Sequence, residues 1–409
     1  GKRRIATSST VARGRSRRIS SAQLPFDTAK ALARAGFSVD VLCGEPREYY
    51  HGPKVPKTET VEGITIHRLG YLQPDRSRTW GRILNYFSFT LSVFFHLGDL
   101  KNYRCALFYS NPPVLPWVAS WAKKLFGCKL VFVSYDLYPE LALRTGALKT
   151  GSSVEKFLSH INKAVYPRLD RVVALSSEMK EFLQENRAID PGRIVVIPNW
   201  YPDGGAPRKD LSRNRFAGDL GGKFVVSYFG NMGTIQDMET ILGAVRALKD
   251  EPDIFFLFAG HGNKLEALKQ SIAREGLHNA QVLEYLHGQD YRDALEISSA
   301  ALISLEAGTT GLCVPSKTYS YMTEGIPLLA IMDRCDIVAD IESGAGKAFH
   351  NGESDRLARE IVAMRDDPQG VQAMGDRCRK LYLQKYTPEV CLPQYEALFR
   401  GLLGPGGRA

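Results

Sequence analysis

Apolar runs of strand length alternate with stretches of helical period along the first 200 residues. Residues 4–8 predict a short strand, and a loop through Gly14 follows. A helix over residues 20–35 is expected to stop at Gly36, before a strand over residues 37–43. Further strands are expected at residues 106–109, 130–134, 171–175 and 194–197. This order of strand, loop, helix, glycine and strand is typical of the first unit of a doubly wound α/β domain.

A second series of the same kind begins at Lys223. Strands are predicted at residues 224–229, 254–258, 281–285, 301–305 and 327–331, with a helix over residues 237–248. Residues 198–207 are rich in turn formers and separate the two series. We therefore expect one α/β domain over residues 1–200 and another over residues 201–385. A C-terminal helical segment is expected over residues 386–409.

Residues 305–330 carry the pattern with the clearest chemistry. A loop with Gly308 and Gly311 follows a predicted strand, and Ser316 after a proline offers a helix start with Lys317 in the first turn. A helix N-terminus behind a glycine-bearing loop suits an anionic ligand such as a diphosphate, because its backbone N–H groups are free and its dipole is positive there. An ordinary strand–loop–helix connection explains the same residues equally well.

The run Gly-Leu-Cys-Val-Pro-Ser-Lys-Thr-Tyr at residues 311–319, with Gly325 and Pro327 after it, resembles the donor-binding segment of family-4 retaining glycosyltransferases. The resemblance is closest to bacterial surface-polysaccharide members that act on lipid-linked sugars. It implies the GT-B fold: two Rossmann-like, doubly wound α/β domains facing a cleft. It also implies that residues 386–409 pack back on the N-terminal domain, and that residues 1–200 bind the acceptor and residues 201–385 the nucleotide sugar.

The resemblance implies a set of donor-binding residues. Lys317 would be the leading cation for the leaving diphosphate, since Asn231 in the glycine loop carries no charge, and amides near Gly233, Gly308 and Gly311 would assist it. His261 lies in a Gly-x-Gly turn where relatives approach the donor, and Leu286 and His287 lie where relatives hold the nucleotide base. The complete donor set is Gly230, Asn231, Gly233, His261, Leu286, His287, Gly308, Thr309, Thr310, Gly311, Leu312, Ser316 and Ser320.

One departure from the family pattern concerns the sugar and ribose half of this site. Most members carry two glutamates eight positions apart, and those positions fall on Leu312 and Ser320 here. Ser320 can hydrogen-bond a ribose hydroxyl, though less strongly than a carboxylate would. Weaker donor affinity or an altered donor is therefore expected.

In the N-terminal domain, Asp136 follows a predicted strand, where ligands sit in open α/β sheets. Its surroundings resemble the Asp-Leu-x-Pro-Glu segment of the same subgroup, so Asp136 is expected to position or deprotonate the acceptor hydroxyl, with Glu140 behind it. The alternative is that Asp136 caps a helix starting near Tyr138. Ser177 and Glu178 are expected to cap a helix.

A basic cluster precedes the first acidic residue, Asp27. Around Gly14 it includes Arg13, Arg15 and Arg17, which suit an acceptor bearing phosphate or pyrophosphate. Such a cluster also attracts anionic lipid, or is simply a solvated surface. Nucleic acid is not expected, because no interleaved aromatic residues or known binding module accompany it.

Residues 80–97 are heavily aromatic and follow two arginines. The segment is too short and too polar to span a bilayer. An interfacial helix lying on a membrane and a helix buried in the domain remain equally open.

The rest of the composition narrows the class of protein. A hydrophobic content of 44% and a charged content of 24% fit a globular enzyme, and the net charge is +9. Seven scattered cysteines indicate reduced thiols and a cytoplasmic location, and neither they nor any His or Asp-x-Asp cluster suggests a metal site. We expect no cofactor and no transmembrane helix.

The sequence therefore predicts a retaining, metal-independent glycosyltransferase that uses a nucleotide sugar as donor. The expected donor is a UDP-sugar. Its acceptor would be a hydroxyl of a glycan or lipid-linked sugar at the inner membrane face. Two alternatives stay open: a transferase acting on a soluble small-molecule glycoside, and a non-catalytic nucleotide-sugar-binding partner subunit. A sugar-nucleotide epimerase is disfavoured, because the carboxylate and histidine pattern that it needs is missing.

Overall fold

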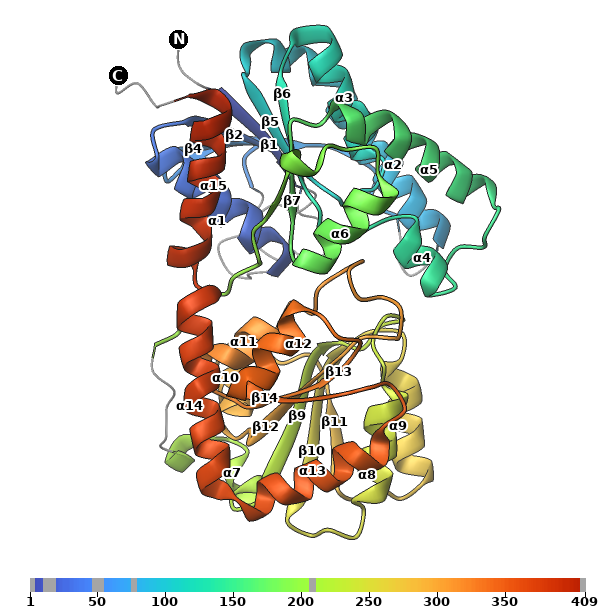
Figure 1. Cartoon of the computed structure of the whole chain (residues 1–409), viewed down its shortest axis with the longest axis vertical. Helices are drawn as coiled ribbons and strands as arrows, with labels where there is room; N and C mark the ends of the chain where they lie inside the picture. Colours follow the sequence, from blue (N-terminus) through green and yellow to red (C-terminus); the bar gives the residue numbers. More distant parts are fainter. Residues whose placement is uncertain (1–3, 10–19, 46–54, 75–78, 206–210, 405–409) are drawn as a thin grey trace. The chain divides into compact units, whose positions relative to one another are not determined.

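The computed structural model describes residues 4–9, 20–45, 55–74, 79–205 and 211–404. Its contacts divide the chain into two compact units. The first comprises Gly1–Asn199, Gly311–Cys313 and Pro388–Ala409, and the second comprises Trp200–Thr310 and Val314–Thr387. Both are α/β units, as the alternation of strands and helices predicted (Figure 1).

The first unit is built on an eight-stranded sheet of order β3-β4-β2-β1-β5-β6-β7-β8. The β3–β4 pair is antiparallel and the other pairs are parallel. The strands are β1 (Arg4–Ser9), β2 (Ser38–Gly44), β3 (Thr58–Val61), β4 (Ile64–Leu69), β5 (Cys105–Tyr109), β6 (Lys129–Val133), β7 (Arg171–Ala174) and β8 (Ile194–Val196). All five residues of the central strand β5 are buried, whereas the edge strand β3 alternates half-buried and exposed residues.

The helices of the first unit include one from the far end of the chain. They are α1 (Ser20–Arg34), α2 (Thr79–Phe95), α3 (Leu115–Phe126), α4 (Glu140–Arg144), α5 (Ser153–Val165), α6 (Ser177–Asn186) and α15 (Pro388–Leu403), with short helices η1 (Leu97–Asn102), η2 (Tyr166–Arg168) and η3 (Pro191–Arg193). Helix α15 packs beside α1 (Figure 1), and the ring of Phe399 meets that of Phe37 edge-on at 6.3 Å.

The second unit has a parallel six-stranded sheet of order β11-β10-β9-β12-β13-β14. The strands are β9 (Phe224–Asn231), β10 (Ile254–His261), β11 (Ala280–Leu283), β12 (Ala300–Ser304), β13 (Leu328–Ile331) and β14 (Gly346–Phe349). In order of sequence this is the 3-2-1-4-5-6 arrangement of dinucleotide-binding folds, which reverses direction between β9 and β12. Ligands of such sheets bind outside the carboxyl ends of the strands at this switch point.

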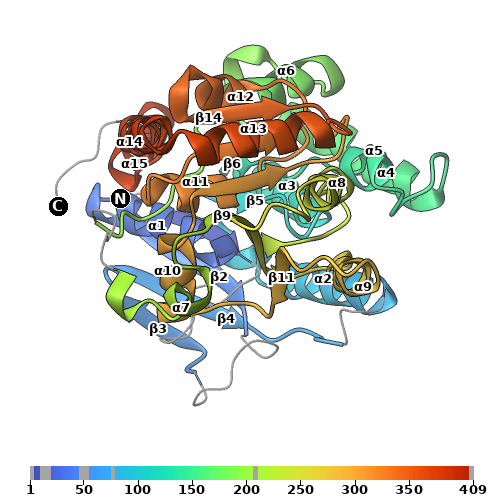
Figure 2. The same cartoon turned by 90° about the horizontal axis from the view of Figure 1, so that it is seen from below.

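Helices flank this second sheet. They are α7 (Ala217–Leu220), α8 (Glu239–Ala247), α9 (Leu265–Arg274), α10 (Gly288–Glu296), α11 (Lys317–Thr323), α12 (Asp336–Asp340), α13 (Ser354–Asp366) and α14 (Pro368–Lys385), with short helices η4 (Leu211–Arg213) and η5 (Ile341–Ala345). Helix α13 packs beside α8 (Figure 1, Figure 2), where the Ser354 hydroxyl donates to the Thr240 carbonyl at 2.9 Å.

The predicted strands are present in both units, each within a few residues of its expected ends. Strand β11 ends at Leu283, so Tyr285 lies beyond it, not in its last position as predicted. The sequence did not predict the β3–β4 hairpin or strand β14. Of the segment 80–97, residues 80–95 lie in α2, and among the helices that the structure describes, none is both long enough and apolar enough to cross a bilayer.

Candidate functional site

The carboxyl ends of β9 and β10 run close together at the switch point of the second sheet. Gly260 lies opposite Gly230 in the register, and a Cβ added at Gly260 would be 1.8 Å from the Gly230 carbonyl oxygen. Gly230 itself has φ 112°, which only glycine adopts freely. Two glycines therefore let the backbone turn closely at this edge, as the donor-loop prediction required.

Lys317 is the first residue of α11, and its side chain reaches this edge. The ammonium donates to the Asn231 carbonyl at 3.1 Å and lies 3.6 Å from the centroid of the Tyr228 ring. Burial lowers the pKa of Lys317 well below its usual value. No carboxylate among the described residues forms an ion pair with it. A half-buried cation without a counter-anion, at the switch point of the sheet, is suited to binding an anionic group.

Helix α11 starts where the sequence predicted, but without the predicted cap by the Ser316 side chain. The helix begins at Lys317 after Ser316, as predicted, and ends at Thr323 before Gly325. The Ser316 side chain is exposed and makes no capping hydrogen bond. The ammonium group of Lys317, more than the start of the helix, therefore makes this turn a candidate site for an anion.

The amides of Gly233 and Gly308 are used inside the protein. The Gly233 N–H donates to the Gln236 side chain at 2.8 Å, and the Gly308 N–H donates to the Asp333 carboxylate at 2.7 Å. The expectation that these two amides stabilise a diphosphate is therefore wrong for this arrangement of the loop. In contrast, the hydroxyl of Thr310 is buried without a hydrogen-bond partner among the described residues.

The loop after β12 is held by charged residues that the sequence did not single out. Lys264 and Glu306 form an ion pair at 2.6 Å, and the Lys264 ammonium also donates to the Gln236 carbonyl at 2.6 Å. The Thr309 hydroxyl donates to the Glu306 carbonyl at 2.6 Å. Lys264 follows the predicted Gly-x-Gly turn, so its place in the chain was a signal that could have been used.

The two positions that replace the family glutamates are both buried. Ser320 donates its hydroxyl to the Lys317 carbonyl at 2.8 Å, and its oxygen lies 3.2 Å from the Tyr291 hydroxyl. Leu312 belongs by its contacts to the first unit, together with Gly311. The Ser320 hydroxyl is therefore already engaged inside the protein, and its remaining hydrogen-bonding capacity is one acceptor lone pair.

A cluster of three rings lies at the carboxyl end of β10 and just beyond that of β11. The centroid of the Tyr285 ring is 5.3 Å from that of His261 and 4.6 Å from that of His287. Burial, and then the charge of Lys317, lowers the pKa of His261, which favours the neutral form of its ring. Leu286 is half-buried between Tyr285 and His287 in the chain. Tyr285 was not predicted, because its residue pattern continued the preceding strand.

In the first unit, Asp136 follows β6, one strand away from the switch point between β1 and β5. The backbone N–H groups of Tyr135 and Asp136 both donate to the Ser110 hydroxyl at 3.1 Å, which ties the turn to the end of β5. Burial raises the pKa of Asp136 to about 6. The capping alternative is wrong, because α4 begins at Glu140 with Pro139 in the capping position.

Glu140 is engaged by an arginine that the sequence did not identify. The Arg187 guanidinium donates two hydrogen bonds to its carboxylate at 2.9 and 2.7 Å, and it lies over the Tyr166 ring. Arg187 also donates to the Tyr138 carbonyl at 3.4 Å. Glu140 therefore anchors the segment that carries Asp136. At α6, the capping residue is Ser176, not Ser177 or Glu178.

Four predicted acceptor residues, Arg13, Gly14, Arg15 and Arg17, lie outside the described residues. Within the described ranges, no group of three or more histidine, cysteine, aspartate or glutamate side chains is placed to hold a metal ion.

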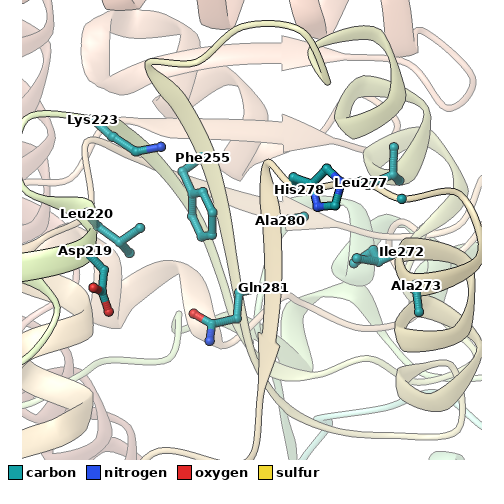
Figure 3. Close-up of a pocket in the computed structure, with 11 residues that line it drawn as sticks. Asp219, Leu220, Lys223, Phe255, Ile272, Ala273, Leu277, His278, Ala280 and Gln281 are labelled. Carbon is teal, nitrogen blue, oxygen red and sulfur yellow. The ribbon is translucent and has the colours of Figure 1, made fainter.

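A cavity of about 470 Å³ lies in the second unit, at the amino ends of β9, β10 and β11 (Figure 3). Lys223 and Phe255 face each other across part of it, and the Lys223 ammonium donates to the Pro252 carbonyl at 3.1 Å. It includes none of the predicted donor residues and lies at the wrong end of the sheet for them, so we assign it no function.

Comparisons with known proteins agree with this architecture. Residues 26–200 match the family model of the glycosyl transferase 4-like domain. The chain is 27% identical over 300 residues to a protein of Pseudomonas aeruginosa named as a probable glycosyltransferase, WbjE, covering 72% of this chain and 74% of that protein. It is 25% identical over 316 residues to a protein of Escherichia coli (strain K12) named "putative colanic acid biosynthesis glycosyl transferase WcaI", covering 72% of this chain and 75% of that protein.

Two solved structures are similar along nearly the whole chain. Sucrose-phosphate synthase from Thermosynechococcus elongatus superposes with a TM-score of 0.75 at 15% identity, covering 98% of this chain and 99% of that one. Anabaena HepE, solved in complex with UDP-glucose, superposes with a TM-score of 0.70 at 15% identity, covering 97% and 99%. These comparisons agree with the resemblance noted at residues 311–327: residues 26–200 match a glycosyl transferase 4-like domain, and the whole chain has the GT-B fold.

Proposed function

We propose that this glycosyltransferase moves a sugar from a nucleotide sugar, UDP-linked, to a hydroxyl of a glycan or lipid-linked acceptor. The observation that carries this proposal is Lys317, a half-buried cation without a carboxylate partner among the described residues, at the switch point of the second sheet. A diphosphate would supply the missing negative charge. The UDP-glucose complex of HepE and the naming of WcaI for colanic acid biosynthesis support the donor and the glycan class.

In this proposal the bond between the sugar and the diphosphate breaks, and the nucleoside diphosphate leaves with its negative charge stabilised by Lys317. The acceptor oxygen attacks from the face that the diphosphate leaves, so the anomeric configuration is retained. The acceptor proton passes to Asp136, whose raised pKa suits a general base. No metal ion or cofactor is included, because Lys317 can carry the charge stabilisation that a metal would otherwise supply.

The remaining site residues of the proposal divide by unit. His261, Leu286 and His287 would surround the nucleoside, with Tyr285 added by the ring cluster. Arg13, Gly14, Arg15 and Arg17 would contact the acceptor, and Glu140 would act through Arg187 by holding the Asp136 segment. We further propose a peripheral position at the cytoplasmic face of the inner membrane, which a lipid-linked acceptor requires.

A panel of nucleotide sugars tests the proposal. Release of the free nucleoside diphosphate identifies the donor, and NMR of the product of a glycan or lipid-linked acceptor gives the configuration of the new bond. Retention with a UDP-sugar is expected. Inversion of configuration, or turnover that needs an added divalent cation, would contradict the mechanism.

A second candidate is a non-catalytic partner subunit that binds a nucleotide sugar, and Leu312 and Ser320 in place of the usual glutamates favour it. Donor binding by calorimetry without turnover on any acceptor would favour that role. Transfer to a small soluble glycoside, without any lipid-linked acceptor, would favour the remaining alternative.

A further inference from the structure

Helix α2 leaves an apolar stripe uncovered. Its buried side, with Phe89 and Val93, packs into the first unit. The opposite side presents Trp80, Leu84, Phe87, Leu91 and Phe95 at spacings of three and four residues, and Phe95 is 75% exposed. A helix that is apolar on both sides is normally buried all round, so the residues that the structure describes leave this side of α2 without an apolar environment.

The stripe continues onto two neighbouring helices. The Phe87 ring of α2 stacks with Phe157 of α5 at 6.4 Å, and Trp117 of α3 meets Phe157 at 6.5 Å. Trp121 adjoins Trp117 at 6.3 Å. Helices α2, α3 and α5 lie together on the first unit (Figure 1). We call their exposed apolar side chains the aromatic face.

This concentration is not the ordinary scatter of apolar residues on a protein surface. Of the fifteen exposed large apolar side chains among the described residues, twelve lie on α2, α3 and α5. Contiguous exposed patches of this kind mark interaction surfaces.

The charges around the aromatic face indicate its partner. Helices α2 and α3 contain no acidic residue, and the three helices together carry five basic residues against the single Glu155. Lys124, Lys156 and Lys163 are exposed, and the Lys124 ammonium lies 5.9 Å from the Trp121 ring centroid. Tryptophan and phenylalanine bordered by lysine is the composition of a surface that sits at a lipid headgroup boundary.

We propose that the aromatic face of α2, α3 and α5 docks this protein on a bilayer containing anionic phospholipid. The apolar side chains enter the headgroup boundary while the lysines meet the lipid phosphates. The proposal rests on the membrane position given under the proposed function and makes it more specific: the contact surface comprises three helices, not residues 80–97 alone. It is compatible with both interpretations of residues 80–97, since one side of α2 is buried and the other is exposed.

Tryptophan fluorescence tests this directly, because three of the four tryptophans, Trp80, Trp117 and Trp121, lie on the aromatic face and Trp200 is buried. Vesicles of phosphatidylglycerol mixed with phosphatidylcholine should bind the full chain and shift its emission to the blue. Phosphatidylcholine brominated near the headgroup should quench that emission.

Variants separate the apolar and ionic contributions. Leu91→Ser combined with Phe95→Ser and Trp121→Ser should weaken vesicle binding at least about tenfold. Leu383→Ser, an equally apolar exposed residue of α14, should leave it unchanged. Lys124→Gln with Lys156→Gln and Lys163→Gln should weaken binding to anionic vesicles by roughly 100-fold, at about fivefold per lysine, and leave binding to neutral vesicles nearly unchanged. Circular dichroism checks that each variant is folded.

Three results would overturn the proposal: no vesicle binding by the wild type at low salt, equal loss in Leu383→Ser, or a concentration-dependent dimer that protects the tryptophans from an aqueous quencher without lipid. The last would make a second copy the occupant of the aromatic face. Transfer from nucleotide sugars to a water-soluble glycan acceptor is measured in parallel without vesicles. Vesicle binding without transfer would contradict the proposed catalysis alone, and transfer without vesicle binding would contradict the docking surface alone.

Discussion

Replacing Lys317 by methionine should make the protein more stable and less able to bind its donor. The ammonium is half-buried, and its described partners are the Asn231 carbonyl and the Tyr228 ring. Methionine keeps most of the side-chain volume and removes the charge. Because Asn231 is exposed, water can take over the lost hydrogen bond at its carbonyl. Removing an uncompensated cation from a half-buried position should stabilise the free protein by about 1 kcal/mol, or roughly 2–4 °C in Tm.

Donor binding should change in the opposite direction. A charge-assisted hydrogen bond to a phosphate contributes about 1.5–3 kcal/mol, so the Kd for UDP should rise by about 10- to 100-fold. If Lys317 also stabilises the leaving diphosphate, turnover should fall by roughly 100- to 1,000-fold. Calorimetry with UDP, thermal unfolding and initial rates measure the three effects on the same samples.

The pH dependence of stability gives an independent check. Burial lowers the pKa of Lys317 in the folded protein, so the unfolded chain binds more protons between that pKa and the usual lysine pKa of about 10.4. The stability penalty of Lys317 is therefore complete at pH values below the folded pKa and disappears as the pH rises toward about 10. The Tm advantage of Lys317→Met should shrink accordingly, and at pH values above the folded pKa UDP binding to the wild type should be accompanied by proton uptake.

Lys223 offers a matched control. It also lies against an aromatic ring, Phe255, and donates to a backbone carbonyl, but at the amino ends of the strands. Lys223→Met should leave UDP affinity and turnover unchanged. A Lys317→Met protein that binds UDP as tightly as the wild type would refute the assignment of the diphosphate site.

Two further predictions concern the first unit. Asp136→Asn should lower transfer to the acceptor by about 100-fold while the Kd for UDP stays constant. Because the pKa of Asp136 is about 6 and the base must be ionised, the wild-type rate of transfer should fall as the pH drops below about 6. A variant that keeps this pH profile would remove Asp136 from the mechanism. Arg187→Met should destabilise the protein by about 3 kcal/mol in thermal or urea unfolding, because it leaves the Glu140 carboxylate without its bidentate partner. The double variant Arg187→Met with Glu140→Gln should recover part of that lost stability. If Glu140→Gln alone abolished transfer without any loss of stability, Glu140 would be an acceptor ligand and not an anchor.

Much of the fold could be predicted because its strands and helices have strong periodic patterns. The all-apolar strands β5 and β12 are buried on both sides, so their sequences differ sharply from the loops beside them. The hairpin of β3 and β4 was missed because Thr58–Val61 at the sheet edge has few apolar residues. Strand β14 was missed for a similar reason, since its four residues begin with glycine and lysine.

The candidate site was predictable where it depends on local sequence and unpredictable where it depends on pairing across the fold. The position of Lys317 at the start of a helix follows from the residues around it. Its bond to Asn231 joins residues 86 positions apart, and the bond of Glu140 to Arg187 joins residues 47 positions apart. The occupied amide of Gly308 also depends on a partner that no local pattern indicates, Asp333, which lies 25 positions away in the chain.

Helix α15 has a consequence for how this chain folds during synthesis. The first unit contains both Gly1–Asn199 and Pro388–Ala409, so the second unit is inserted within it along the chain. The ribosome releases every strand of the second sheet before it releases Phe399, which packs against Phe37. The inserted unit can thus reach its native state first, while the first unit waits with the surface of α1 uncovered. A chaperone that recognises nascent chains should bind that surface during this interval, and release it when α15 docks.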